Sequence, residues 1–261
     1  MLAWSSQITK GLAMSFPHRQ LVAPLLLINC LLVAPFCLGS PFRESVTIAV
    51  LQVASAATLV GGSFAIFDLF RQGSAAAVAV GQAITPVPAL AFSLLLLSSS
   101  VTVWQAVGDV VVSAAVLLAL GPVFGQLSRL RAAVTVLLAA AFNGLLVVLT
   151  KLLTDRGVGV AEIYATRTGL AGVAARMIVA PRDIPLGAYR PLTVRSAMQS
   201  AYFVLLILAV QRGSPVTVQT LAATTPIMLL VADAVLGRRR PPARLVLAAL
   251  GVMAGVALSV T

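Results

Sequence analysis

Residues 130–152 read LRAAVTVLLAAAFNGLLVVLTKL, and the only two charged residues in this run, Arg131 and Lys151, stand near its ends. A helix rises about 1.5 Å per residue, so a run of this length crosses the roughly 30 Å hydrocarbon core of a bilayer. A barrel strand would alternate in polarity over about ten residues, whereas this run is continuously apolar. The stretch therefore predicts a membrane-spanning helix.

The composition of the whole chain has the same character. Of its 261 residues, 60% are hydrophobic and 10% are charged, and the mean hydropathy is +1.04, whereas a soluble domain carries about 25% charged residues. No soluble core could hide that much apolar surface. The net charge of +11 comes from arginines that stand singly or in threes between apolar stretches. This spacing indicates a role in membrane orientation and argues against nucleic acid as a partner.

Turn signals divide the chain into nine apolar runs, each of a length that suits a membrane helix. The predicted spans are 21–38, 46–69, 74–97, 101–121, 130–152, 158–180, 192–211, 214–236 and 243–260. The first twenty residues lack the apolar core of a signal peptide, so we expect the first span to stay in the membrane. The predicted fold is an all-α membrane protein with nine to ten transmembrane helices.

An internal repeat emerges when the chain is aligned with itself. Without a gap, Gly73-Ser74 falls on Gly213-Ser214 and Thr85-Pro86 falls on Thr225-Pro226. The alignment divides the chain into a first repeat at residues 1–125, whose first helix is short or missing, and a second at 126–261 with five helices. The loop at 98–100 has no basic residue and its counterpart at 238–240 has three. We therefore predict that the two repeats have inverted topology.

This pattern resembles the EamA-type branch of the drug/metabolite transporter superfamily. The residues that carry the resemblance are 211–215 (QRGSP), 225–227 (TPI) and 250–256 (LGVMAGV), with a weaker echo at 71–121 that includes 104–108 (WQAVG). The resemblance implies two inverted helical bundles that enclose a cavity near the bilayer midplane. It also implies secondary transport of a small metabolite or drug, with export as the expected direction.

The sequence carries no signature of an enzyme. It has no HExxH, GxSxG, Walker A or GxGxxG pattern, and its sole histidine, His18, lies in a predicted loop. We therefore expect no catalytic residue, no metal site and no cofactor. A transporter in the plasma (inner) membrane, with the lipid bilayer and a small-molecule substrate as its partners, is the main interpretation. The alternatives are a non-transporting membrane helper or scaffold protein and, after it, an intramembrane enzyme.

Three of the charged residues inside predicted spans are the most strongly placed, and a charge at the bilayer centre costs at least about 2.5 kcal/mol. They are Asp109, Glu162 and Arg167. Arg167 cannot lose its proton, so it needs a carboxylate or a hydrated cavity. One interpretation is a structural ion pair with Glu162 or Asp109. The other makes Arg167 a docking point for an anionic or zwitterionic substrate, with Glu162 or Asp109 carrying a proton. We expect Arg167 and at least one of the acids to face a shared cavity, with Asp109 as a cross-bundle partner.

Several neutral polar residues also fall inside spans and could either line a transport path or bridge helices. They are Asn29, Gln52, Gln82, Asn143, Gln199 and Tyr202; Gln82, Gln199 and Tyr202 are candidates for the path. Pro86 and Pro226 are expected to bend their helices and to serve as hinges or cavity walls. Gly251 and Gly255 form a GxxxG pattern that favours close helix packing over ligand binding. Proton coupling and homodimer formation stay open.

We predict that the loop at 237–242 is cytoplasmic and the C-terminus external, because short cytoplasmic loops are enriched in Lys and Arg. Successive connections between spans lie on opposite sides of the membrane. When they are assigned in this way, one side has twelve basic residues: Lys10, Arg19, Arg71, Arg129, Arg131, Arg182, Arg190, Arg195, Arg238, Arg239, Arg240 and Arg244. The other side has four: Arg43, Lys151, Arg156 and Arg212. A reporter that is active only in the cytoplasm should work within this loop, and its activity after Thr261 would overturn the assignment.

Overall fold

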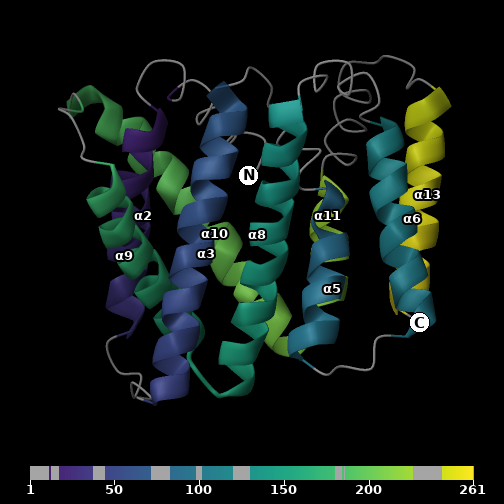
Figure 1. Ribbon diagram of the computed structural model, residues 1–261, viewed down its shortest axis with the longest axis horizontal. Helices are drawn as coiled ribbons and strands as arrows, with labels where there is room; N and C mark the ends of the chain where they lie inside the picture. Colours follow the sequence, from purple (N-terminus) through teal and green to yellow (C-terminus); the bar gives the residue numbers. More distant parts are fainter. Residues whose placement is uncertain are drawn as a thin grey trace. The chain divides into compact units, whose positions relative to one another are not determined.

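The computed structural model describes residues 12, 18–37, 45–71, 83–97, 102–119, 130–179, 184, 186–225 and 243–260, and within these ranges every regular element is a helix (Figure 1). The elements are η1 (His18–Leu21), α2 (Val22–Val33), η2 (Ala34–Cys37), α3 (Val46–Arg71), α5 (Pro86–Leu96), α6 (Val103–Ala119), α8 (Leu130–Asp155), α9 (Val160–Ile178), η4 (Leu186–Ala188), α10 (Tyr189–Arg212), α11 (Pro215–Ala223) and α13 (Ala243–Val260).

Four helical segments are long and apolar enough to cross a membrane: Arg19–Cys37, Val46–Phe70, Ala133–Asp155 and Tyr189–Arg212. Shorter apolar helices follow at Pro86–Leu96, Val103–Leu118 and Val246–Leu258. Each of the nine predicted spans contains a described helix, although parts of the runs 74–97 and 214–236 lie outside the described residues. The continuous apolar runs thus fold as helices, which confirms the predicted fold class.

The chain forms two compact units, and each draws on both halves of the sequence. Unit 1 consists of Met1–Ala75 and Leu149–Arg212, and unit 2 of Ala76–Val148 and Gly213–Thr261. The predicted boundary at residues 125 and 126 concerns repeats along the chain rather than compact units, and it stays a prediction. A candidate site within one unit is therefore assembled from segments that lie far apart in the sequence.

In unit 1, α9 packs against both α2 and α3, and α10 packs against α2. Small residues allow the closest approach, because a Cβ on Gly172 would lie 2.8 Å from the side chain of Leu27 in α2. Where α3 ends, Asp68 accepts hydrogen bonds of 3.2 and 2.8 Å from Arg19 at the start of the first span. This pair ties the beginning of the first predicted span to the end of the second.

Unit 2 is organised around the contact between α6 and α13, which lie side by side (Figure 1). A Cβ on Gly255 would lie 2.8 Å from the backbone oxygen of Gly108, and a Cβ on Gly251 would lie 2.9 Å from the Cβ of Ala115. The GxxxG pattern of α13 is thus the surface on which α6 packs, as predicted. A second close contact joins α8 to α5, where a Cβ on Gly144 would lie 2.7 Å from the Ala89 nitrogen.

The helix pairs in both units follow the spacing of the internal repeat. A shift of 140 residues carries α6 onto α13 and places α2 inside α9, and both pairs are in extensive contact. The same shift relates the contact between α3 and α9 to the contact between α10 and α2. These correspondences support the predicted duplication, which itself stays a prediction.

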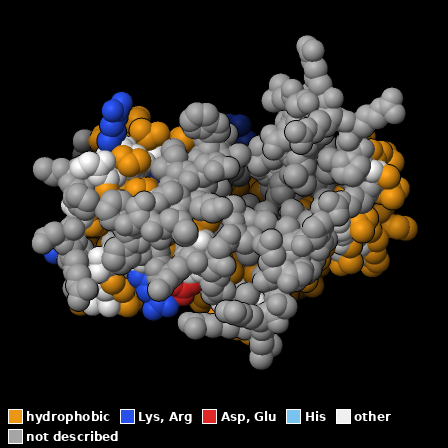
Figure 2. Space-filling model, turned by 90° about the horizontal axis from the view of Figure 1, so that it is seen from above, with side chains coloured by type: hydrophobic (Ala, Val, Ile, Leu, Met, Phe, Trp, Pro, Cys, Tyr) orange, Lys and Arg blue, Asp and Glu red, His pale blue; other side chains and the backbone are white. Residues whose placement is uncertain are grey.

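Unit 2 displays large apolar side chains on its surface, as a lipid-facing helix pair would. Exposed residues on α6 and α13 include Val103, Trp104, Val107, Val110, Leu247, Leu250 and Met253. Figure 2 shows hydrophobic side chains gathered on the right of the view, where Figure 1 draws these two helices. Soluble monomers rarely expose apolar patches of more than a few hundred Å². The surface therefore suits contact with acyl chains.

We predict that Gly255→Leu destabilises the protein and that Ala254→Leu, on the exposed side of the same helix, does not. The added side chain at residue 255 would meet the backbone of Gly108 and Val112, and overpacking of this kind costs about 1–3 kcal/mol. Thermal unfolding of the detergent-solubilised protein measures the difference. Equal melting temperatures for the two variants would show that α6 and α13 do not pack through this surface.

Candidate functional site

Arg167 is the centre of the candidate site in unit 1. It lies near the middle of α9 and is 1% exposed. One terminal nitrogen, Nη1, donates a 2.9 Å hydrogen bond to Oγ1 of Thr150 in α8, and the guanidinium carbon lies 5.9 Å from the centre of the Tyr164 ring. Its Nε is buried and has no hydrogen-bond partner among the residues that the structure describes. Among the described residues, no carboxylate forms an ion pair with Arg167.

A chain of hydrogen bonds continues from Tyr164 across three helices. The Tyr164 hydroxyl lies 3.3 Å from Oγ of Ser200 in α10, and Ser200 in turn donates to Oδ1 of Asn29 in α2 at 3.3 Å. Because the Ser200 proton is used toward Asn29, the Tyr164 hydroxyl must be the donor to Ser200. The amide nitrogen of Asn29 is buried and has no hydrogen-bond partner in the described part of the chain.

A second buried arginine, Arg195, lies in α10 and is 6% exposed. Its Nη1 donates a 2.7 Å hydrogen bond to Oε1 of Gln199, and its guanidinium carbon lies 5.5 Å from the centre of the Phe67 ring. The alternate assignment of loops counted Arg195 among the basic residues of a loop. In the structure Arg195 lies inside α10, within the predicted span 192–211, and the membrane side that the count assigns to it stays a prediction.

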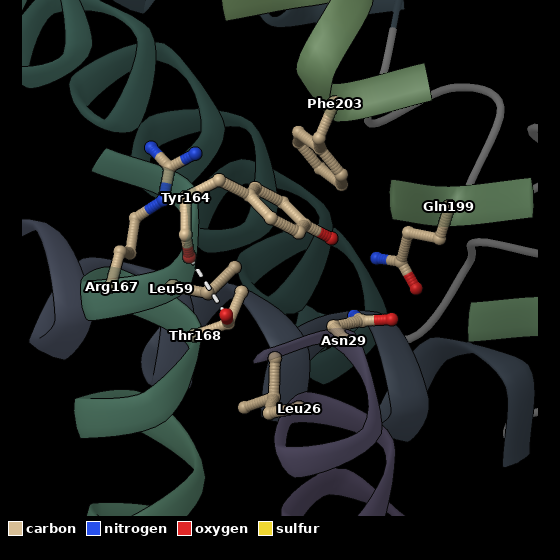
Figure 3. A pocket seen from close by; sticks show the side chains of 8 residues that line it. All are labelled: Leu26, Asn29, Leu59, Tyr164, Arg167, Thr168, Gln199 and Phe203. Carbon is tan, nitrogen blue, oxygen red and sulfur yellow. Dashed lines mark hydrogen bonds between the residues drawn. The ribbon is translucent and has the colours of Figure 1, made fainter. Parts of the chain in front are cut away.

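Some of these residues line a small cavity of about 10 Å³ (Figure 3). Its lining consists of Leu26, Asn29, Leu59, Tyr164, Arg167, Thr168, Gln199 and Phe203, drawn from α2, α3, α9 and α10. The volume is close to the minimum that holds one water molecule. Of the predicted path residues, the structure thus brings Arg167 and Gln199 together, and it adds Asn29 and Tyr164.

Glu162 lies elsewhere, at the start of α9. It is the third residue of the helix and is 5% exposed, and its carboxylate accepts a hydrogen bond from the backbone N–H of Gly159, the N-cap residue. This contact is the second half of a capping box, and a negative charge in the first turn also favours the helix dipole. Glu162 does not line the cavity, so its contacts in the structure are those of a helix cap.

Asp109 belongs to unit 2 and has its own partner there. It is fully buried in α6, and the hydroxyl of Thr220 in α11 donates to its Oδ1. Within the described residues its second oxygen, Oδ2, has no hydrogen-bond partner, and neither does the hydroxyl of Ser113 one turn further along α6. Asp109 and Arg167 are therefore each built into the interior of a different unit.

The structure describes two of the four remaining predicted path and hinge residues, Tyr202 and Pro86. Tyr202 is half-buried and packs edge to face against Phe203, with 5.4 Å between ring centres, but it does not line the cavity. Pro86 is the first residue of α5, directly after a turn at Thr85 that interrupts the helical run. Gln82 and Pro226 lie outside the described residues. The hinge role of the two prolines stays a prediction.

Sequence reasoning missed Tyr164, Ser200 and Thr220 as members of buried polar contacts. Hydroxyl groups in apolar helices can bond to their own backbone, as Thr168 does to the oxygen of Tyr164 at 2.7 Å. Their presence in a span is therefore no signal of a site. One available signal was spacing, because Tyr164 precedes Arg167 by three residues and such pairs share a helix face.

The comparisons with known proteins agree with this architecture. The sequence model of the EamA-like transporter family matches residues 130–261, more than half of the chain. A solved structure, described only as "Crystal structure of protein", has a TM-score of 0.70 and 17% sequence identity, covering 98% of this chain and 93% of that one. This likeness concerns the fold alone. No curated protein shows significant similarity.

The helical membrane fold and the family match together define the class of protein: a multi-pass integral membrane protein of a transporter family. The chain belongs to the EamA-like transporter family, which is part of the drug/metabolite transporter superfamily. The family is one of transporters rather than enzymes. A small-molecule substrate and the lipid bilayer are accordingly its partners.

We predict that Thr220→Val destabilises unit 2 by about 1–3 kcal/mol, because it leaves the buried Asp109 carboxyl group without its hydrogen-bond donor. Thr217→Val is the matched control, since this half-buried threonine lies on the same helix and forms no hydrogen bond through its side chain in the structure. Thermal unfolding in detergent compares the two. An equal loss of stability in both variants would contradict a specific role of the Thr220 hydroxyl.

Proposed function

We propose that this protein is a secondary transporter that moves a small metabolite or drug across the plasma membrane, in the direction of export. The proposal rests on membership of a transporter family and on the buried polar site within an otherwise apolar helix set. Transport proceeds by alternating access, with the two repeats moving about a substrate site near the bilayer midplane. No described segment has the size of a soluble domain, which suits work carried out within the bilayer.

The burial of Arg167 is the observation that carries this proposal. A guanidinium is always charged, and enclosing it without a carboxylate partner is costly. A helper or scaffold protein gains nothing from such a residue, whereas a transporter uses it to bind a polar substrate inside the membrane. Arg167 is therefore the proposed substrate-binding residue, and Gln199 contributes to the same cavity.

Asp109 is the proposed proton carrier. Among the described residues of unit 2 it is the buried acid with an unpartnered oxygen, whereas Glu162 is engaged with the first turn of its own helix. A carboxyl group that is buried beside a hydroxyl can hold a proton in one conformation and release it when another conformation lets water in. Proton coupling through Asp109 would supply the energy for export. Dimer formation has no role in this proposal.

Metabolite measurements in cells that overproduce the protein test the transport function. Cells with the unchanged protein should show at least one metabolite whose ratio of outside to inside concentration rises. Arg167→Gln should abolish this rise while the protein is still inserted in the membrane. The matched control is Arg176→Gln, an exposed arginine on the same helix, which should export normally. Full activity of Arg167→Gln would remove Arg167 from the site, and no change in any metabolite would contradict transport.

The same cells test the coupling. We predict that Asp109→Asn makes export independent of external pH between about pH 5 and 8, because an amide cannot take up a proton. Its near-isosteric shape keeps the Thr220 contact as a hydrogen bond to the amide oxygen. A variant that exports with the same pH dependence as the unchanged protein would show that Asp109 does not carry the proton.

A further inference from the structure

We infer that the unit 1 cavity is the binding site of a single water molecule, which joins α2, α9 and α10 by one hydrogen bond to each helix. Asn29 supplies the bond from α2, Tyr164 the bond from α9 and Gln199 the bond from α10. The inference goes beyond the proposed function, because it concerns the occupant of the closed cavity and not the substrate. It follows from the size of the cavity and from the hydrogen-bonding atoms at one end of it.

The size of the cavity sets the first limit on its occupant. Its volume of about 10 Å³ corresponds to about one water molecule, whereas a pocket for a drug-sized ligand measures roughly 300 Å³ or more. Leu26, Asn29 and Tyr164 in the lining are each at most 2% exposed. In this conformation the cavity therefore takes one water, and a substrate enters only when the helices move apart.

The polar groups of the lining lie at two ends of the Tyr164 ring. Figure 3 shows the Tyr164 hydroxyl together with the amides of Asn29 and Gln199 at one end, and the Arg167 guanidinium at the other. The first end thus combines hydrogen-bonding groups from three helices. Arg167 instead donates to Thr150 in α8. The water belongs at the end where the amides lie.

The amide of Asn29 supplies the first hydrogen bond to the water. Its Oδ1 accepts from Ser200 at 3.3 Å, whereas its Nδ2 is buried and has no hydrogen-bond partner within the described part of the chain. A buried N–H group without a partner costs free energy, and the hydrocarbon core of a bilayer offers no solvent to satisfy it. A water oxygen beside Nδ2 accepts this hydrogen.

Gln199 and Tyr164 add a second donor and an acceptor. Arg195 can only donate, so the Gln199 atom that it meets at 2.7 Å is the amide oxygen, and the amide nitrogen points toward the Tyr164 hydroxyl (Figure 3). That hydroxyl gives its proton to Ser200 and keeps a lone pair for one more bond. The water accepts from both amides and donates to Tyr164, which makes the three bonds typical of a buried water.

The same atoms argue against an ion in the cavity. A cation would meet the N–H groups of two amides and would be repelled by the buried Arg167 and Arg195. An anion would meet the lone pair of the Tyr164 hydroxyl. Water accepts and donates at the same time, so it alone of these occupants matches a mixed set of donors and acceptors.

Radiolytic footprinting of the full-length protein in detergent tests for the water, because hydroxyl radicals formed from a bound water modify the buried side chains beside it. Leu26 and Leu25 are a matched pair on α2, 1% and 2% exposed, of which Leu26 lines the cavity. Leu26 should be modified several-fold faster than Leu25. Tyr164 should also be modified, whereas Phe67, a ring as buried but outside the lining, should not. Equal rates for the two leucines would overturn the inference.

A first variant removes the proposed donor. Asn29→Leu has no N–H group in its side chain, and its two methyl groups occupy the space of the amide. Modification of Leu26 and Tyr164 should therefore fall to the rate of Leu25. Rapid modification of both residues in a folded Asn29→Leu protein would show that Asn29 does not hold the water, and it would overturn the site.

A second variant keeps every polar group and enlarges the cavity. Leu59→Ala should admit more water beside the amides, so the modification rate of Tyr164 should rise. Leu153→Ala is the matched control, because this leucine packs with Val158 and Ile163 in an apolar cluster, and an apolar cavity stays dry. The control should leave the rate of Tyr164 unchanged. An unchanged rate in Leu59→Ala as well would show that the cavity holds no water.

Chloride replacement separates the water from a small anion. Exchange of chloride for gluconate at constant ionic strength should leave the modification rates of Leu26 and Tyr164 unchanged. Rates that rise when chloride is removed would show that chloride occupies the cavity in place of water, and they would overturn the inference.

Discussion

A permanent positive charge enclosed among apolar helices is the constraint around which unit 1 is built. Arg167 is nearly inaccessible in the middle of α9, so its donors must be satisfied by the protein or by a ligand. Thr150 takes one of them and the Tyr164 ring lies near the guanidinium. The neighbouring groups then form a chain from Tyr164 through Ser200 to Asn29. This chain links polar groups of α9, α10 and α2 in the interior of the unit.

Close packing of small residues helps to hold this polar interior together in a bilayer. Gly172 brings α9 against α2, and Gly255 brings α13 against α6 at the backbone beside Asp109. Without a hydrophobic driving force between helices in lipid, such van der Waals contacts are a main source of association. Both units therefore pack through small residues, and each encloses ionisable side chains: Arg167, Arg195 and Glu162 in unit 1 and Asp109 in unit 2.

Much of the fold could be predicted because its signal is local. Each apolar run of the sequence contains a helix in the structure, and the GxxxG pattern of α13 lies at a helix contact as expected. The site was harder to predict. Arg167 and Gln199 line one cavity, but Glu162 caps its helix and Arg195 proved to be buried. These differences depend on tertiary contacts, because both residues lie in predicted spans and only the packing of the helices decides which neighbours they meet.

The sequence by itself determined that this chain is a helical membrane protein, because hydropathy and the length of apolar runs can be read locally along the chain. It also identified the charges whose burial demands an explanation. Only the tertiary structure decided which residues meet. Asn29, Arg167 and Gln199 are far apart in the chain, and their shared cavity exists because α2, α9 and α10 pack together in one unit. Hydrogen-bond partners between distant segments are set by that packing, which no local pattern encodes.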